Sequence, residues 1–227
     1  TYQPITPLST LVTAMVLSGT PVSEARTSVA RVLGLSSTSV LDKDPLLQVM
    51  TEPSLLQKMV SIQKAMEVLA SADKNPAERA PGAPPPANAI ERIAKALGAE
   101  ITRIAASLPA NPTALPSVAS LVTGATANHA QYFSNPVAIQ SASALASDIA
   151  NLTESTLAVG MSQILKDTNA TANTASIANA LTAFVDTRLT AISGLQVNAF
   201  KVATTIGPSA PTSPVAAIRL DEVAKTA

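Results

Sequence analysis

The chain contains no cysteine and no tryptophan, and aromatic residues make up only 2% of its 227 residues. The absence of thiols excludes disulfide bonds, zinc–thiolate sites and cysteine nucleophiles. Because large aromatic side chains are so scarce, the core must be built from Leu, Ile, Val and Ala. The lack of cysteine is compatible with a secreted bacterial protein.

Charged residues are also scarce. They account for 13% of the chain, with 15 basic residues balanced by 15 acidic ones, whereas a typical soluble domain carries about 25%. A nucleic-acid-binding protein needs a basic face, so we expect no nucleic-acid partner. The low charge favours an extracellular protein, or one whose surface is covered in an assembly.

Long apolar runs are missing as well. The most apolar stretch, Leu8 to Leu17, is short and is interrupted by Ser9, Thr10 and Thr13. A membrane-spanning helix needs about 18 or more apolar residues, so no transmembrane span is expected. Because the chain begins at Thr1 rather than at Met, we interpret it as a processed product or a fragment of something larger.

A long stretch from Pro136 to Ile206, rich in Ala, Ser and Thr, predicts two long helices. Asn135 can cap the first helix, and Pro136 suits the first helical position. Its apolar residues recur at helical steps of three and four: Ala138, Ala142, Leu145, Ile149, Leu152, Thr156 and Val159.

A polar break at Asp167 to Ala172 should separate this helix from the second, which would run from about Asn173 to Gly207–Pro208. Two long helices joined by a short loop are expected to form an antiparallel hairpin. Its side chains are small and bury little apolar area each, so other helices or another subunit must complete the core.

The first part of the chain uses the same helix signals twice. Thr6–Pro7 should open a helix that ends at Ser18–Gly19, and Thr20–Pro21 should open another that ends at Leu33–Gly34. The expected inner face of the second helix contains Val22, Ala25, Val29, Val32 and Leu33. A Ser/Thr loop from Leu35 to Lys43, a short helix after Pro45 and a long helix from Glu52–Pro53 to Ala72 should follow.

This N-terminal part carries a resemblance. Ile5-Thr-Pro-Leu-Ser-Thr-Leu-Val, Val32-Leu-Gly-Leu and Leu41-Asp-Lys-Asp-Pro-Leu occur in order, and the segment from Ile5 to Ala72 resembles a helical module of large secreted bacterial cell-surface, adhesin-like proteins. In that family a similar motif follows a small β-sandwich repeat. The resemblance implies secretion and a surface, matrix or appendage setting, and it supplies no catalytic residues. Beyond Ala72 the likeness is compositional only.

The middle of the chain predicts a proline-rich linker and further helices. Asp73 to Ala87 contains Pro76, Pro81 and a run of three prolines, which favours an extended spacer. A helix is expected from Ala87 to Leu108, with an inner face of Ile90, Ile93, Ala94, Leu97, Ile101 and Ile104. A shorter helix should begin at Leu115–Pro116 and end between Gly124 and His129, before an aromatic turn at Tyr132–Asn135.

Together these patterns predict an all-α fold, a multi-helix bundle of roughly six to eight helices with a long antiparallel hairpin over residues 136–206. The expected organisation is an N-terminal helical module (1–72), a proline-rich linker (73–87), a helical bundle with the hairpin (88–207) and an extended tail (208–227). Whether Val215 to Ala224 forms a strand or a helix, or pairs with a neighbour, is left open.

No pattern indicates a catalytic, cofactor or metal site. His129 is the single histidine, and without a second histidine or a cysteine we interpret it as a surface or turn residue rather than a ligand or acid–base group. Asp42 and Asp44 could offer oxygens to Ca²⁺, but the glycine-centred loop and distal Glu of a calcium loop are missing. We therefore interpret both as solvated loop and helix-start acids.

The leading hypothesis is a non-enzymatic structural protein of the bacterial cell exterior, located outside the cell, on its surface or in the periplasm. It would be a self-assembling subunit of a filament, matrix or adhesin, with itself or other envelope proteins as partners. The alternative is a helical accessory or ligand-binding subunit of a cell-envelope complex. The small, uncharged helix faces are equally compatible with packing inside one chain and with an interface between subunits.

Overall fold

A computed structural model describes residues 6–45, 48, 51–73, 88–109 and 112–167. Over these residues all regular structure is helical, with no strand, as the sequence predicts. The elements are α1 (Pro7–Leu17), α2 (Val22–Leu33), η1 (Thr38–Asp42), α3 (Pro53–Ala72), α4 (Ala89–Ser107), α5 (Val118–Asn128), η3 (Ala130–Tyr132) and α6 (Pro136–Asp167).

The chain divides into two compact units, Thr1–Glu154 and Ser155–Ala227. In the second unit the described residues are the last turns of α6, 155–167. The expected short helix after Pro45, the linker beyond Asp73, the second long helix with its hairpin, and the C-terminal tail lie outside the described residues. None of the described helices is long and apolar enough to cross a membrane.

The helix ends of the N-terminal part follow the signals in the sequence. Thr6 and Ser9 form a reciprocal cap, in which the Thr6 hydroxyl accepts from the Ser9 amide at 3.1 Å and the Ser9 hydroxyl accepts from the Thr6 amide at 2.8 Å. This satisfies two backbone groups at the start of α1. Gly34 ends α2 with a φ of +69°, a conformation that glycine adopts without strain.

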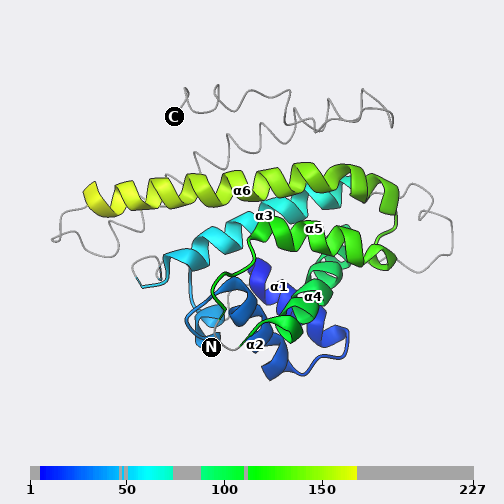
Figure 1. The fold of residues 1–227 in the computed structure, drawn as a ribbon, viewed down its shortest axis with the longest axis horizontal. Coiled ribbons are helices and arrows are strands. Elements are labelled where there is room, and N and C mark those ends of the chain that lie inside the picture. Colours follow the sequence, from blue (N-terminus) through cyan, green and yellow to red (C-terminus); the bar gives the residue numbers. More distant parts are fainter. Residues whose placement is uncertain (1–5, 46–47, 49–50, 74–87, 110–111, 168–227) are drawn as a thin grey trace. The chain divides into compact units, whose positions relative to one another are not determined.

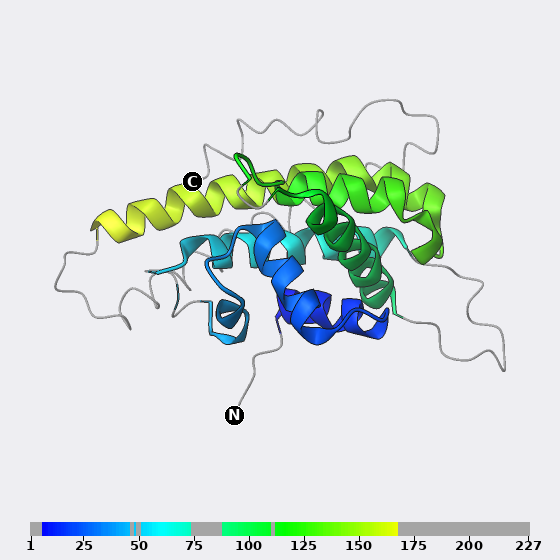
Figure 2. The ribbon, with the colours of Figure 1, turned by 60° about the horizontal axis from the view of Figure 1, so that its bottom comes forward.

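Helix α4 lies at the centre of the first unit, where it contacts α1, α2, α3, α5 and η3 (Figures 1 and 2). Its apolar stripe is buried, including Ile93, Leu97 and Ile101. Gly98 allows α1 to come close, because a Cβ at this position would lie 2.7 Å from Cγ of Met15. The burial of these side chains against the neighbouring helices forms the apolar core of the first unit.

The first half of α6, from Pro136 to Glu154, packs on α3 and α5 (Figure 1). Small side chains bring the helices close enough for direct polar contacts. Ser61 donates to the carbonyl of Ala150 at 2.8 Å, and the hydroxyls of Thr126 and Ser143 share a hydrogen bond of 2.6 Å. Hydrogen bonds from hydroxyl groups therefore stabilise the contact of α6 with α3 and α5, where each residue buries little apolar area.

Several details of the sequence prediction are wrong. Val22 and Ile90, expected on inner faces, are exposed, because each lies in the first turn of its helix, where no neighbouring helix covers it. The loop from Leu35 to Lys43 contains the 3₁₀ turn η1. Helix α5 begins at Val118 rather than at Leu115–Pro116, because Ser117 is its N-cap and accepts a hydrogen bond from the Ser120 amide.

The buried face of α6 is wider than the predicted stripe, of which Ala142, Leu145 and Ile149 are buried as expected. Ile139 and Ala146 are fully buried although the prediction omitted them, and Val159 is exposed. Two neighbouring helices, α3 and α5, contact α6 at different angles around its axis, so its buried face is wider than a single stripe. The Asn135–Pro136 start is confirmed, since Oδ1 of Asn135 accepts from the Ala138 amide at 3.2 Å.

Candidate functional site: a groove on the first two helices and three buried carboxylates

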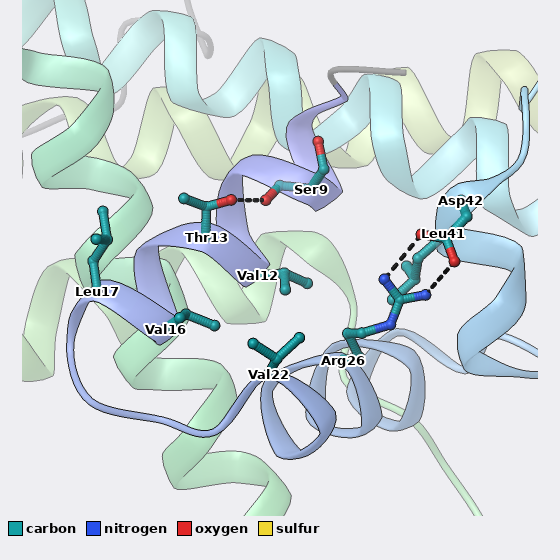
Figure 3. A pocket seen from close by; sticks show the side chains of 9 residues that line it. All are labelled: Ser9, Val12, Thr13, Val16, Leu17, Val22, Arg26, Leu41 and Asp42. Atoms are coloured by element: carbon teal, nitrogen blue, oxygen red, sulfur yellow. Dashed lines mark hydrogen bonds and ion pairs between the residues drawn. The ribbon is translucent and has the colours of Figure 1, made fainter. Parts of the chain in front are cut away.

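A groove of about 270 Å³ lies between α1, α2 and η1 (Figure 3). Val12 and Val16 on α1 face Val22 on α2 across it, and Leu41 closes it on the η1 side. Leu17, at the end of α1, is 69% exposed and Val22 is 57% exposed, so the rim as well as the wall is apolar. Such a surface gains free energy when an apolar group covers it.

The hydroxyl groups in the groove are already used by the helix that carries them. Ser9 donates to the Thr6 carbonyl at 2.9 Å and Thr13 donates to the Ser9 carbonyl at 2.8 Å. Bonds of this kind satisfy the hydroxyl proton locally. The α1 side of the groove therefore presents mainly methyl groups to whatever enters it.

One end of the groove is closed by an ion pair between Arg26 of α2 and Asp42 of η1. The Arg26 Nη1 and Nη2 atoms donate to Oδ1 and Oδ2 of Asp42 at 2.9 and 2.5 Å, and Nη2 also donates to the Thr38 carbonyl at 3.0 Å. These hydrogen bonds, with the positive charge of Arg26, lower the pKa of Asp42 below its usual value despite some burial. The Asp42 carboxylate is thus held by a guanidinium, and a cation would have to displace it.

A second cluster lies in the interior, around Glu100 of α4, whose residue surface is 1% exposed. Its carboxylate accepts hydrogen bonds from Arg103 (Nε 2.9 Å, Nη2 2.6 Å), from Nδ2 of Asn128 (3.3 Å) and from Nε2 of His129 (3.0 Å). We call Glu100, Arg103, Asn128 and His129 the Glu100 cluster. It joins α4 to the corner where α5 ends and η3 begins.

The surroundings of Glu100 determine how readily its carboxyl group ionises. Burial alone disfavours the ionised form, but the hydrogen bonds from Arg103, Asn128 and His129 together with the charge of Arg103 outweigh it, so the pKa of Glu100 lies below its usual 4.5. Gly124 of α5 leaves room for the carboxylate, because a Cβ there would lie 2.1 Å from Oε1. The close approach of α4 and α5 and the buried charge therefore depend on each other.

A second buried carboxylate, that of Asp73, is completely buried at the C-cap of α3. Its Oδ2 accepts from Nε of Arg92 at 2.6 Å, its Oδ1 from the Asn135 amide at 2.9 Å, and its carbonyl from Nη2 of Arg92 at 2.9 Å. The sequence prediction placed Asp73 at the start of a linker. Its side chain also joins the end of α3, the first turns of α4 and the residue that caps α6.

Glu52, before α3, is the remaining buried acid of this kind. It accepts from the Ser36 amide at 3.1 Å and from the Ser54 hydroxyl at 2.6 Å. Burial opposes its ionisation, but these hydrogen bonds outweigh the burial and lower the pKa of Glu52. It fastens the chain after Gly34 to the start of α3.

The structure brings together one residue singled out from the sequence and one that was missed. His129, interpreted as a surface or turn residue, lies at the α5–η3 turn with its side chain only 14% exposed, and its partner is Glu100. Glu100 could have been found, since it lies three residues after Leu97 and one before Ile101, on the apolar stripe of α4. A charged residue on such a stripe needs a partner.

The described residues include no group of three or more His, Asp or Glu side chains arranged to hold a metal ion. Asp44 has an interaction of its own. Within the same residues no buried side-chain nitrogen or oxygen lacks a hydrogen-bond partner. The three buried carboxylates are therefore occupied in holding helices together, whereas the groove is open to solvent.

Comparison with protein-family models, with curated proteins and with solved structures finds no match to this chain.

Proposed function

We propose that the chain is a non-enzymatic structural protein of the bacterial cell exterior that assembles with copies of itself through helix packing. The observation that carries the proposal is the α1–α2 groove, with its apolar wall and the exposed Leu17 and Val22 on its rim. Both a hollow and projecting side chains occur on one patch. Two copies related by a twofold axis could therefore place the projections of each in the hollow of the other.

Two further features support the proposal. Helix α1, which forms one wall of the groove, contains no charged residue. The groove also lies on residues 5–72, the segment that resembles a module of secreted bacterial surface proteins. A weakly charged surface desolvates at little cost, which suits a subunit that is covered in an assembly.

The test is the oligomeric state of the full chain, measured by size-exclusion chromatography with light scattering over a range of concentrations. We expect concentration-dependent association of the native chain. The double substitution Leu17→Lys/Val22→Lys puts two charges into the contact and should give a monomer. A native chain that stays monomeric at the highest concentrations would overturn the proposal.

Val137→Lys is the matched control, because Val137 is the most exposed of these apolar side chains and lies on α6, away from the groove. We expect it to leave association unchanged. If Val137→Lys alone abolishes association, the contact is on α6 and not on the groove. Electron microscopy of the associated form would then show whether the assembly is closed or extends as a filament.

The alternative, a ligand-holding subunit of an envelope complex, is favoured by the size of the groove, since about 270 Å³ is near the lower end of the volumes usual for small-molecule sites. Methyl signals of Val12, Val16 and Val22 in an NMR titration with short aliphatic compounds would test it. Saturable shifts confined to these three residues, in a chain that remains monomeric, would favour the alternative.

A further inference from the structure

The corner between α5 and α6 contacts an interior carboxylate as well as apolar side chains. His129 ends α5 and begins η3, Phe133 follows, and α6 starts after Asn135. Glu100 reaches this corner from α4 and receives hydrogen bonds from Asn128 and His129, two consecutive residues of the turn. Two hydrogen bonds to the carboxylate of Glu100 thus hold the turn against α4.

Protonation of the Glu100 carboxylate would weaken the hydrogen bonds that stabilise this arrangement. An ionised carboxylate only accepts hydrogen bonds, and here four N–H groups from Arg103, Asn128 and His129 point at its two oxygens. A protonated carboxyl group carries an O–H that must itself donate, so it offers one acceptor position fewer to these groups and no longer carries the negative charge that strengthens the hydrogen bonds. The charge that Arg103 and, when protonated, His129 compensate would also be gone.

Other titratable groups around α4 do not replace Glu100 in this role. Helices α1 and α5 contain no titratable side chain, and the turn contributes only His129 and Tyr132, whose rings lie 6.2 Å apart. Arg31 of α2 donates to the carbonyls of Ala105, Leu108 and Pro109 at the end of α4. At the other end, Asp73 after α3 pairs with Arg92.

We propose that the Glu100 cluster is an acid-sensitive clamp that holds the α5–η3 corner while Glu100 is ionised and releases it when the carboxylate takes up a proton. The direction follows from the depressed pKa of Glu100. A group of this kind stabilises the folded arrangement above its usual pKa, and the stabilisation disappears as the pH falls through the folded value. The corner is thus held at neutral and mildly acidic pH and is released in stronger acid.

The experiment is amide hydrogen exchange by NMR on the full chain between about pH 6 and pH 3, expressed as protection factors so that the intrinsic pH dependence cancels. The amides of Tyr132 and Phe133, which donate to the carbonyls of His129 and Ala130, should lose about tenfold in protection relative to α3 amides. Glu100→Gln should show the lower protection already at pH 6 and no further loss in acid. Equal protection of corner and α3 amides throughout, or the same acid loss in Glu100→Gln, would overturn the proposal.

Two further measurements keep the proposal testable if Glu100→Gln does not fold. Because His129 is the single histidine, its ring proton signal is unique and should move in acid when Glu100 takes up its proton, and this acid step should coincide with the loss of protection. Arg103→Ala keeps the two corner donors, Asn128 and His129, but removes the guanidinium that lowers the pKa of Glu100, so the midpoint of corner release should move up toward the usual pH of about 4.5. An unmoved midpoint, or a ring signal without the acid step, would contradict the clamp.

Discussion

Asp73 and Asp42 each bind an arginine, but in opposite settings. The Asp73–Arg92 pair has side chains that are 0% and 13% exposed, whereas the Asp42–Arg26 pair at the groove is 40% and 25% exposed. Water and salt screen the second pair and leave the first at nearly full strength. The same chemistry therefore stabilises the helix arrangement in the interior, whereas at the groove it forms an exposed edge that contributes less.

The largest effect is expected for Asp73→Ala. It would remove the buried carboxylate that accepts from Nε of Arg92 and from the backbone amide of Asn135, a loss of about 3–5 kcal/mol in the free energy of unfolding. Urea unfolding followed by circular dichroism measures it. Asp42→Ala is the matched control on the exposed pair, and equal losses for the two variants would show that burial does not separate them.

Gly124→Ala should have the next largest effect. The added methyl group would overlap the Glu100 carboxylate, with the Cβ 2.1 Å from Oε1 and 2.7 Å from Cδ. Moving either α5 or the carboxylate costs about 1–3 kcal/mol, the usual range for overpacking. Gly98→Ala is a useful comparison, since its Cβ would meet the flexible side chain of Met15. A smaller loss at Gly98 than at Gly124, in the same urea assay, is expected.

The dependence of stability on pH should follow the buried acids rather than Asp42. The pKa values of Glu52 and Glu100 lie below their usual 4.5, so both groups stabilise the fold above that pH and lose this contribution as the pH falls through their folded values. The free energy of unfolding should fall between about pH 5 and pH 3, and Glu52→Gln/Glu100→Gln should flatten this fall. If Asp42→Asn reduces this fall in the free energy of unfolding equally, the exposed Asp42–Arg26 pair contributes as much to the pH dependence as the buried acids do.

The elements were predictable where a local signal ends them. Thr6–Pro7, Gly34 and Asn135–Pro136 place helix ends through caps that involve only nearby residues, and all three are confirmed. Burial was predictable only where the stripe runs through the middle of a helix. Val22 and Ile90 were assigned wrongly because periodicity does not show where the neighbouring helix stops.

The groove and the buried clusters could not be predicted, since each depends on segments far apart in the chain. The hydrogen bond between Asp73 and Asn135 joins residues that are 62 positions apart in the sequence, and the one between Glu100 and His129 joins residues that are 29 positions apart. No local pattern encodes such contacts, although an acid on the apolar stripe of α4 indicates that a partner must exist. The groove is formed by α1 and α2 together with η1, a 3₁₀ turn that the sequence suggested only as a loop.

The smallest effect is expected for Asp42→Asn. It removes the negative charge opposite Arg26 and keeps an oxygen that can still accept one hydrogen bond, so the free energy of unfolding should fall by less than about 1 kcal/mol. Raising the salt concentration should bring the native chain and the variant closer together, because ions already screen an exposed pair. At Asp73, in contrast, salt should leave the difference between Asp73→Ala and the native chain almost unchanged. Salt dependence of unfolding is thus a more sensitive test than absolute stability of whether the groove edge and the interior use the same interaction in different ways.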